Sequence, residues 1–324
     1  MARALDEGGL AAAAGDVDGD GYTDLLIFNG QVLQLMANRG KARDGQPGEF
    51  QGRIAVSAMA RQSQYGSILL GDLDDDGLLD AVVAGCCGRL FTLNPDNDTP
   101  NFSWVWRNQS EAGRSAGQML TALDGLAVQA AALGDVDGDG TLDLFVAVMA
   151  PPQGRNRDAA DRVLLNDGAG DLADSGQRLG DSDSTAVALG DVDGDGDLDA
   201  LVGDGSGAVV WFNQGGAQAG QEGTFDPSGR TLRGRPVMAL FLADLDGDGD
   251  PDAVIGERSG ARIWWNDGHG IFTRSRQRFS ASQKHGWAVG DFDGDGRLDV
   301  FAASYTRDYR LWLNQGESTF RTVP

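Results

Sequence analysis

The stretch DVDGDGDLD at Asp191–Asp199 sets the fold of this sequence, because closely related versions of it return along the chain. The pattern D-x-D-x-D-G-x-x-D begins six times, at Asp16, Asp72, Asp135, Asp191, Asp244 and Asp291. Successive copies start 47 to 63 residues apart, and one sixth of the 324 residues is 54. A period of this length indicates a chain built from six structural repeats.

Each repeat also carries short apolar runs in a fixed order around the acidic stretch. In the fourth repeat AVALG precedes the motif, ALVG follows it, and VVWFN comes next. The third run ends on Asn in every repeat, at Asn38, Asn94, Asn166, Asn213, Asn266 and Asn314. A fourth segment opens at Phe50, Phe102, Leu172, Phe225, Phe272 and Phe320. Four short strands per repeat, without a helix-length amphipathic run, are typical of a propeller blade.

We therefore predict an all-β fold: a six-bladed β-propeller of four-stranded antiparallel blades with a calcium loop in each blade. A single domain is expected over residues 1–324, with repeat units at approximately 10–57, 66–110, 127–178, 184–232, 236–280 and 285–323. The alternatives are a seven-bladed propeller, with one blade on a longer parent chain, and an incomplete propeller.

The acidic stretch has the composition of a cation-binding loop. Asp at positions 1, 3 and 5 brings three carboxylates round one point, Gly at position 6 permits the turn, and Asp at position 9 closes the shell. The backbone carbonyl at position 7 adds one more oxygen. A set of oxygen ligands without His or thiolate selects a hard cation, so the sequence predicts about six calcium ions, one per loop.

The predicted ligands are Asp16, Asp18, Asp20, Tyr22 and Asp24 in the first loop; Asp72, Asp74, Asp76, Leu78 and Asp80 in the second; Asp135, Asp137, Asp139, Thr141 and Asp143 in the third; Asp191, Asp193, Asp195, Asp197 and Asp199 in the fourth; Asp244, Asp246, Asp248, Asp250 and Asp252 in the fifth; and Asp291, Asp293, Asp295, Arg297 and Asp299 in the sixth.

Two other calcium motifs share part of this pattern and do not fit. An EF-hand needs a bidentate Glu at position 12 and a helix on each side. Position 12 is apolar in every copy, at Ile27, Val83, Val146, Val202, Ile255 and Ala302. A nonapeptide β-helix needs a period of nine residues, which the sequence does not have.

The six loops, together with strings such as LWLNQGESTF at Leu311–Phe320, resemble the FG-GAP and VCBS calcium-binding propeller repeats. Such repeats occur in integrin α-subunit head domains, in fungal propeller lectins and in many bacterial secreted proteins. The resemblance spans essentially the whole chain and is closer to the VCBS type, because no Phe-Gly or Gly-Ala-Pro string is present. It implies a calcium-binding propeller that recognises a partner, without an integrin-like heterodimer role.

The charge of the chain follows from these loops. The formal net charge is -23, but the loops hold 27 of the 49 acidic residues, which leaves 22 acids against 26 basic residues. An acidic field argues against nucleic acid as a partner.

No apolar run is long enough for a membrane span, and no signal peptide is visible at Met1–Leu10. Sites with a dissociation constant of about 10⁻⁴ M would be empty at cytosolic calcium, which favours an extracellular or periplasmic location.

No catalytic motif accompanies the repeats, so we predict a non-enzymatic recognition or adhesion module for protein or glycan. His269 and His285 are expected in solvated loops, and the neighbours Cys86 and Cys87 cannot join distant segments. The alternatives are a lectin that binds carbohydrate between blades and a polysaccharide-active enzyme.

The ligand is expected on the face opposite the calcium loops, where the connections carry arginines that include Arg233, Arg235, Arg258, Arg262 and Arg310. The seven tryptophans are expected mainly in packing between blades. Asn97, Asn101 and Asn108 fit the glycosylation pattern.

Overall fold

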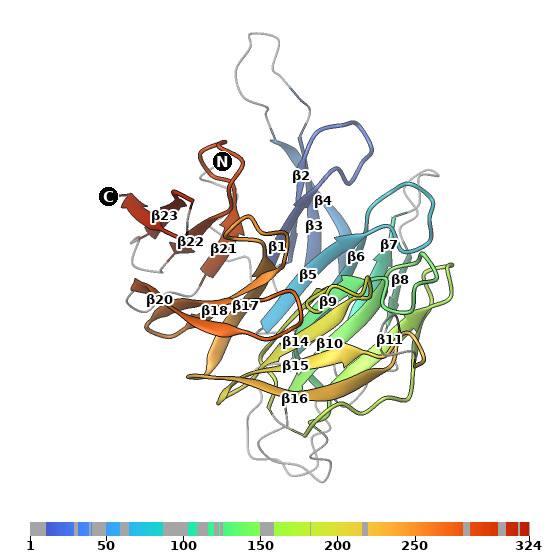
Figure 1. Ribbon diagram of the computed structural model, residues 1–324. Helices are drawn as coiled ribbons and strands as arrows, with labels where there is room; N and C mark the ends of the chain where they lie inside the picture. The colour runs from blue at the N-terminus through green and yellow to red at the C-terminus, as the bar shows by residue number, and fades with distance from the viewer. Residues whose placement is uncertain are drawn as a thin grey trace, which may run out of the picture. The chain divides into compact units, whose positions relative to one another are not determined.

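The computed structural model describes residues 11–28, 32–38, 40, 50–58, 65–86, 103–108, 116–119, 123, 126–149, 159–181, 183–215, 220–280, 286–303, 309–316 and 318–323. The strands form six four-stranded sheets (Figure 1). Neighbouring strands within each sheet are antiparallel. The fold is a six-bladed β-propeller, as predicted. Among these residues, no helix is long and apolar enough to cross a membrane.

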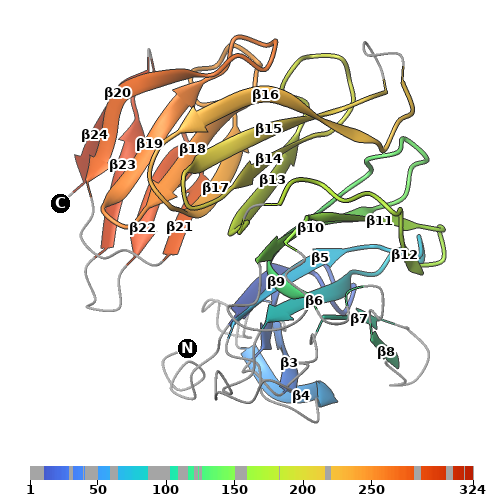
Figure 2. The same cartoon turned by 90° about the horizontal axis from the view of Figure 1, so that it is seen from below.

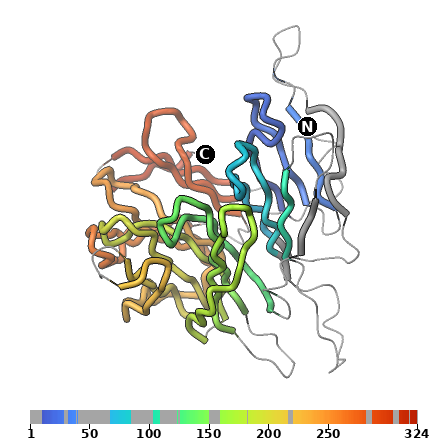
Figure 3. The backbone as a smooth tube through the Cα atoms, turned by 90° about the vertical axis from the view of Figure 1, so that its right-hand side faces the viewer, coloured from blue at the N-terminus to red at the C-terminus, as the bar shows by residue number. Residues whose placement is uncertain are grey.

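The chain divides into two compact units, and the first holds residues Met1–Asp135 and Asp139–Ser182. Its blades are β1 (Ala11–Gly15), β2 (Asp24–Phe28), β3 (Val32–Asn38) and β4 (Phe50–Ala58); β5 (Tyr65–Gly71), β6 (Asp80–Cys86), β7 (Trp104–Arg107) and β8 (Ala116–Met119); and β9 (Ala127–Gly134), β10 (Asp143–Met149), β11 (Arg162–Asn166) and β12 (Leu172–Asp174). The innermost strand β5 contacts both β1 and β9, so the three blades follow one another in chain order (Figure 3).

The second unit holds residues Val136–Gly138 and Asp183–Pro324. Its blades are β13 (Ala186–Gly190), β14 (Asp199–Gly203), β15 (Gly207–Asn213) and β16 (Phe225–Arg233); β17 (Val237–Ala243), β18 (Asp252–Glu257), β19 (Gly260–Trp265) and β20 (Thr273–Ser280); and β21 (Gly286–Gly290), β22 (Asp299–Ala303), β23 (Tyr309–Asn314) and β24 (Phe320–Val323). Here β17 contacts β13 and β21, and the three sheets lie side by side (Figure 2).

The apolar runs of the sequence form the cores between neighbouring blades. In the first unit Leu26 and Phe28 of β2 pack in one cluster with Trp104 and Trp106 of β7. In the second unit Trp312 of β23 lies 5.1 Å, ring centroid to ring centroid, from Phe279 of β20. Trp104, Trp106 and Trp312 are buried, so the prediction that these tryptophans pack between blades is confirmed.

The second repeat differs from the prediction in its outer half. Its third strand is β7, which is followed by Asn108, whereas the predicted strand ending at Asn94 and the predicted fourth-strand residue Phe102 lie outside the described residues. The fourth strand is β8, which comes after Asn108. The assignment of Phe102 to a fourth strand was wrong, because Phe102 precedes the third strand.

Candidate metal centres

Each acidic stretch forms the loop between the first and second strands of its blade. In the first blade Gly15 of β1 pairs with Asp24 of β2, so the loop begins and ends on neighbouring strands. The same closing pair joins Gly190 to Asp199 in the fourth blade. Position 9 is therefore always the first residue of the second strand, at Asp24, Asp80, Asp143, Asp199, Asp252 and Asp299.

Two positions of each loop adopt left-handed backbone angles. The predicted glycine at position 6 has φ between 85° and 101° in all six loops. Position 4 is also left-handed: it is Gly in five loops, and in the second loop it is Asp75, with φ of 55°. Position 4 has no role in the predicted ligand set, and its left-handed conformation, which favours Gly, explains why Gly stands there five times.

The carboxylate at position 1 holds the loop closed. In the first loop Asp16 Oδ1 accepts a hydrogen bond from the Asp20 amide at 3.1 Å, and Asp16 Oδ2 accepts one from the Gly21 amide at 2.8 Å. Asp20 Oδ1 in turn accepts from the Tyr22 amide at 3.0 Å. The equivalent bonds to positions 1 and 5 recur in the second, fourth and sixth loops. Hydrogen bonds to their own carboxylates therefore hold these loops closed without the help of a cation.

The aspartate at position 9 is fully buried and ties two segments together. Asp199 Oδ2 accepts a hydrogen bond from the Val192 amide at position 2, at 3.0 Å, and Asp199 Oδ1 accepts one from the Asn213 amide at the end of β15, at 2.9 Å. The same pair of acceptor bonds occurs at Asp24, Asp80, Asp252 and Asp299. This carboxylate holds the second strand, the loop and the end of the third strand in one arrangement.

The asparagine that ends the third strand connects neighbouring blades. Asn166 Nδ2 donates to the Leu73 carbonyl, at position 2 of the preceding blade's loop, at 2.8 Å. It also donates to the Leu142 carbonyl in its own loop at 3.1 Å. The bond to the preceding loop recurs at Asn108, Asn213, Asn266 and Asn314, whose acceptors are Val17, Val136, Val192 and Leu245. We call these five bonds the blade clip.

The blade clip also identifies the asparagine that ends the third strand of the second repeat. Asn108 takes the position predicted for Asn94, because its backbone amide donates to Asp80 Oδ1 at 2.7 Å. Asn108 is also one of the predicted glycosylation candidates. Its side-chain nitrogen donates to the carbonyls of Val17 and Leu79. A glycan on this nitrogen would replace one of its two hydrogens, so at most one of the two bonds could remain. Asn97 and Asn101 lie outside the described residues.

The loops bring carboxylate oxygens close enough to share a cation. Six groups of three or more possible ligands occur in the described residues, with the ligand atoms of each group within 4.8 Å of one another. Four of these groups combine positions 1, 3 and 9 of one loop: Asp16, Asp18 and Asp24; Asp72, Asp74 and Asp80; Asp135, Asp137 and Asp143; and Asp191, Asp193 and Asp199. In the fifth loop the group is Asp244, Asp246 and Asp248. Ligation of a metal ion by these carboxylates, by the other position-5 residues and by the position-7 carbonyls stays a prediction.

The donor set fits a divalent cation. Asp74 Oδ1 and Asp135 Oδ1 are buried and accept no hydrogen bond from the described part of the chain. A buried carboxylate oxygen without a partner is costly, and such atoms are uncommon in folded proteins. A hard cation between positions 1, 3 and 9 would give these oxygens the partner that the described residues do not provide.

The pKa values of several loop carboxyls are raised, so their ionised forms are disfavoured in the loops without a cation. Burial raises the pKa of Asp199 and of Asp252 to about 7, although their backbone hydrogen bonds partly oppose this shift. Burial also raises the pKa of Asp80, to about 6. At Asp74 burial and then repulsion by Asp76 and Asp72 raise the pKa. A bound cation acts in the opposite direction, because it favours the ionised carboxylate.

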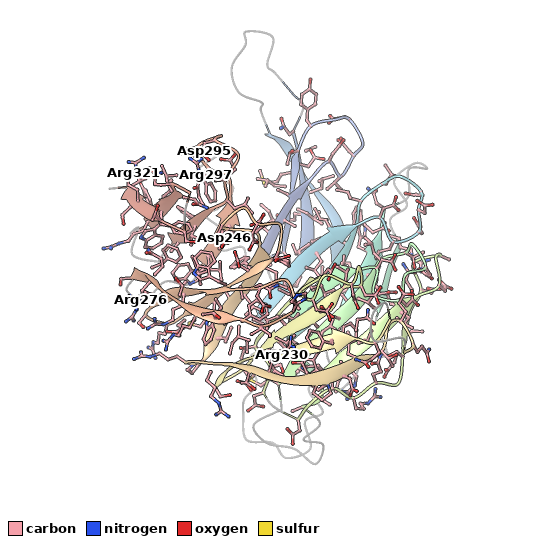
Figure 4. The ribbon with its side chains drawn as sticks, in the orientation of Figure 1. Arg230, Asp246, Arg276, Asp295, Arg297 and Arg321 are labelled. Atoms are coloured by element: carbon pink, nitrogen blue, oxygen red, sulfur yellow. The ribbon has the colours of Figure 1, made fainter. Side chains whose placement is uncertain are left out.

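The sixth loop already contains a positive charge. Arg297, at position 7, pairs through Nη2 with the carboxylate of Asp295 at position 5, and its Nε donates to the Asn314 carbonyl at 3.0 Å (Figure 4). A guanidinium on Asp295 occupies a carboxylate that was predicted to ligate calcium. This loop therefore differs electrostatically from the other five, whose position-7 residues are Tyr22, Leu78, Thr141, Asp197 and Asp250.

The remaining candidate residues lie away from these loops or cannot be placed. His269 is exposed in a turn, as expected, whereas His285 and Cys87 lie outside the described residues. The sequence did not predict that the asparagines at the ends of the third strands join neighbouring blades. The recurrence of Asn in every repeat was the available signal, but the acceptor carbonyls are 69 to 93 residues away in the chain.

Comparison with known proteins agrees with the fold. A family model described as FG-GAP-like repeat matches residues 16–83, 135–202, 191–255 and 244–302, and these segments include all six loops. No curated protein matches the chain. A lectin of Agrocybe aegerita, described as recognising non-reducing terminal N-acetylglucosamine, has a similar structure, with a TM-score of 0.65 and 21% identity over 96% of this chain and 79% of the lectin. BBS1N in complex with ARL6DN has a TM-score of 0.57 at 11% identity, over 98% of this chain and 82% of that chain.

Proposed function

The chain belongs to the FG-GAP-like repeat family, and we propose that it is a non-enzymatic, calcium-stabilised β-propeller that recognises a protein or glycan outside the cytoplasm. The observation that carries the metal part of this proposal is the buried Oδ1 atom of Asp74 and of Asp135, neither of which accepts a hydrogen bond from the described residues. Calcium is the preferred occupant because it tolerates irregular shells of oxygen ligands, whereas magnesium demands a tighter octahedron.

The calcium loops support a structural role better than a catalytic one. The position-9 carboxylates are buried and hold backbone amides, and the blade clip connects each of the first five loops to the following blade. A cation at such a place stabilises the scaffold, and recognition is then left to surface segments that the rigid scaffold holds in place. An extracellular or periplasmic location follows from weak sites of this kind, which need about millimolar calcium.

Isothermal titration with calcium, and separately with magnesium, tests the metal part of the proposal. We expect about six calcium ions per chain, with tighter binding of calcium than of magnesium at every site. Equal affinity for the two ions, or no heat of binding with either, would contradict it.

Carbohydrate recognition is the favoured form of the ligand, and the similarity to a lectin structure is what suggests testing it first. A glycan array probed in millimolar calcium is expected to give hits that disappear after chelation. An array without hits would leave a protein partner as the ligand. Turnover of a polysaccharide by the calcium-loaded chain would contradict the non-enzymatic part of the proposal.

A further inference from the structure

The second unit carries a group of arginines on and around the outer strands of its middle blade. We call Arg235, Arg262, Arg274, Arg276 and Arg278 the arginine cluster. Arg274, Arg276 and Arg278 are alternate, exposed residues of the outermost strand β20. They alternate with the half-buried Ser275 and Gln277 and so form a row of positive charge, whose spacing is irregular because the register of β20 shifts opposite Arg262 and Trp264. Figure 4 shows Arg276 pointing away from the ribbon.

The cluster continues inward to β19. Arg262 lies directly opposite Arg278 in the β19–β20 register, and Trp264 lies opposite Arg274. Like charges directly opposite each other on two strands are unfavourable. Burial lowers the pKa of Arg262, and so does repulsion from Arg274, Arg278 and Arg235, whereas the Glu257 carboxylate opposes this shift.

Little negative charge offsets this group within the described residues. The one ion pair that a member makes there is between Arg262 Nε and Glu257 Oε1, at 3.8 Å. Arg278 Nη2 donates to the neutral hydroxyl of Ser259 at 3.0 Å, and the Arg274 guanidinium lies 5.9 Å from the centre of the Trp264 ring. In the part of the chain that the structure describes, one carboxylate therefore pairs with a cluster of five arginines, although the net charge of the whole chain is -23.

Protection of an edge strand explains only part of this arrangement. Exposed charges on an outermost strand prevent unwanted pairing with other sheets, and Arg274, Arg276 and Arg278 could serve that end. Arg262 could not, because its side chain is only 20% exposed and its strand is paired on both sides. Arg262 Nε also has no hydrogen-bond partner among the described residues.

Part of the cluster lies at the end of the strands that is away from the acidic loop. The calcium loop of this blade joins β17 to β18, whereas Glu257 and Ser259 lie at the turn from β18 to β19, at the other end of the strands. Arg262 and Arg278 lie next to that turn. An anionic partner could therefore approach Arg262 and Arg278 without facing the carboxylates of the loop, whereas Arg274, opposite Trp264, lies nearer the loop end of the blade.

We propose that the arginine cluster binds an anionic polysaccharide, whose repeated carboxylate or sulfate groups pair with the row on β20 and with Arg262. Guanidinium groups recognise carboxylate and sulfate by paired hydrogen bonds, and a linear row of charges suits a linear polyanion better than a single small anion. This proposal rests on the recognition function above and names the chemical class of its ligand.

Binding of the whole chain to hyaluronan, to dextran sulfate and to neutral dextran, measured in 1 mM calcium at low and high salt, tests this proposal. We expect binding to one or both charged polymers, none to neutral dextran, and weaker binding at high salt. The pair Arg276→Glu and Arg278→Glu should reduce the affinity by about tenfold or more, since it reverses two charges of the row. The two charged probes separate carboxylate from sulfate recognition.

Arg321→Glu is the matched control, because Arg321 is also exposed on an outermost strand and lies well apart from Arg276 in Figure 4. It should change the affinity by less than about twofold. Equal losses in the control and the cluster variant, or binding to polyglutamate in place of both polysaccharides, would overturn the proposal.

Unfolding of each protein in calcium and in chelator is measured in parallel. Calcium stabilisation without polymer binding rejects this inference alone, whereas a lack of calcium stabilisation rejects the proposed function.

Discussion

The side-chain nitrogen of Asn166 donates a 2.8 Å hydrogen bond to the backbone carbonyl of Leu73, in the acidic loop of the preceding blade. Because the Asn166 amide also donates to the buried Asp143, one residue joins the closing carboxylate of its own blade to the loop of its neighbour. This relationship recurs along both units. It makes the loops parts of a connected structural element as well as individual cation sites.

Replacement of Asn166 by Ala should destabilise the chain by about 2–4 kcal/mol, because it leaves the buried carbonyl of Leu73 and the partly buried carbonyl of Leu142 without their donor. Denaturant unfolding in saturating calcium measures this loss. Asn38→Ala is the matched control, since Asn38 Nδ2 donates to Thr23 of its own loop at an exposed position. We expect the control to cost about 1 kcal/mol, and equal losses would argue against the blade clip.

Substitution at Asp80 and at Asp74 should separate the roles of positions 9 and 3. Asp80→Asn places an amide nitrogen against a backbone N–H in a buried site, so it should destabilise by about 2 kcal/mol or more with and without calcium. Asp74→Asn removes a negative charge that is repelled by Asp72 and Asp76, so it should cost stability in calcium only. Unfolding curves in calcium and in chelator check both. A loss in chelator for Asp74→Asn would contradict this assignment.

Asp75→Gly should stabilise the second loop by about 1 kcal/mol, because Asp75 is the one position-4 residue that is not Gly and has φ of 55°. The reciprocal change, Gly247→Ala, should destabilise by a similar amount. Its backbone is left-handed, with φ of 85°, while no atom lies within 4 Å of an added methyl group. Thermal unfolding measures both. Opposite signs are expected, and destabilisation by both changes would refute the role assigned to position 4.

Arg297→Thr should tighten calcium binding at the sixth loop severalfold, since it frees Asp295 from the guanidinium that now contacts it. Thr is the residue at position 7 of the third loop, at Thr141, so the substitution reproduces a loop of the same chain. Calorimetric titration resolves the change as the loss of the weakest site. The reverse substitution, Thr141→Arg, should create a weak site, and no change in either variant would show that Arg297 does not compete with calcium.

The repeat pattern was sufficient to predict the fold because its period, turn residues and apolar runs agree with one another. The left-handed glycine at position 6 was predicted for the same reason: the requirement is local. The assignment at Asn94 failed because RLFTLN, at Arg89–Asn94, has the same composition as a third strand followed by its Asn. The deciding contact is the bond from the Asn108 amide to Asp80, 28 residues away, which sequence alone does not reveal.

The candidate sites were predicted in part. Positions 1, 3 and 9 do bring their carboxylates together in the first four loops, which follows from the tight turn. The hydrogen bonds of Asp199 to the amides of Val192 and Asn213 were not foreseen, because a carboxylate at position 9 was read only as a ligand. The pairing of Arg297 with Asp295 was also not foreseen, because position 7 was considered only for its carbonyl.

Thermal unfolding in 1 mM calcium and in excess chelator tests most directly whether these loops are calcium sites that stabilise the propeller. With a dissociation constant of about 10⁻⁴ M, each site adds roughly 1.4 kcal/mol at that concentration, and six sites add about 8 kcal/mol, which rivals the whole stability of an ordinary domain. We predict a large fall in the melting temperature on chelation and its recovery when calcium is restored. An unchanged melting temperature in chelator would contradict the calcium assignment.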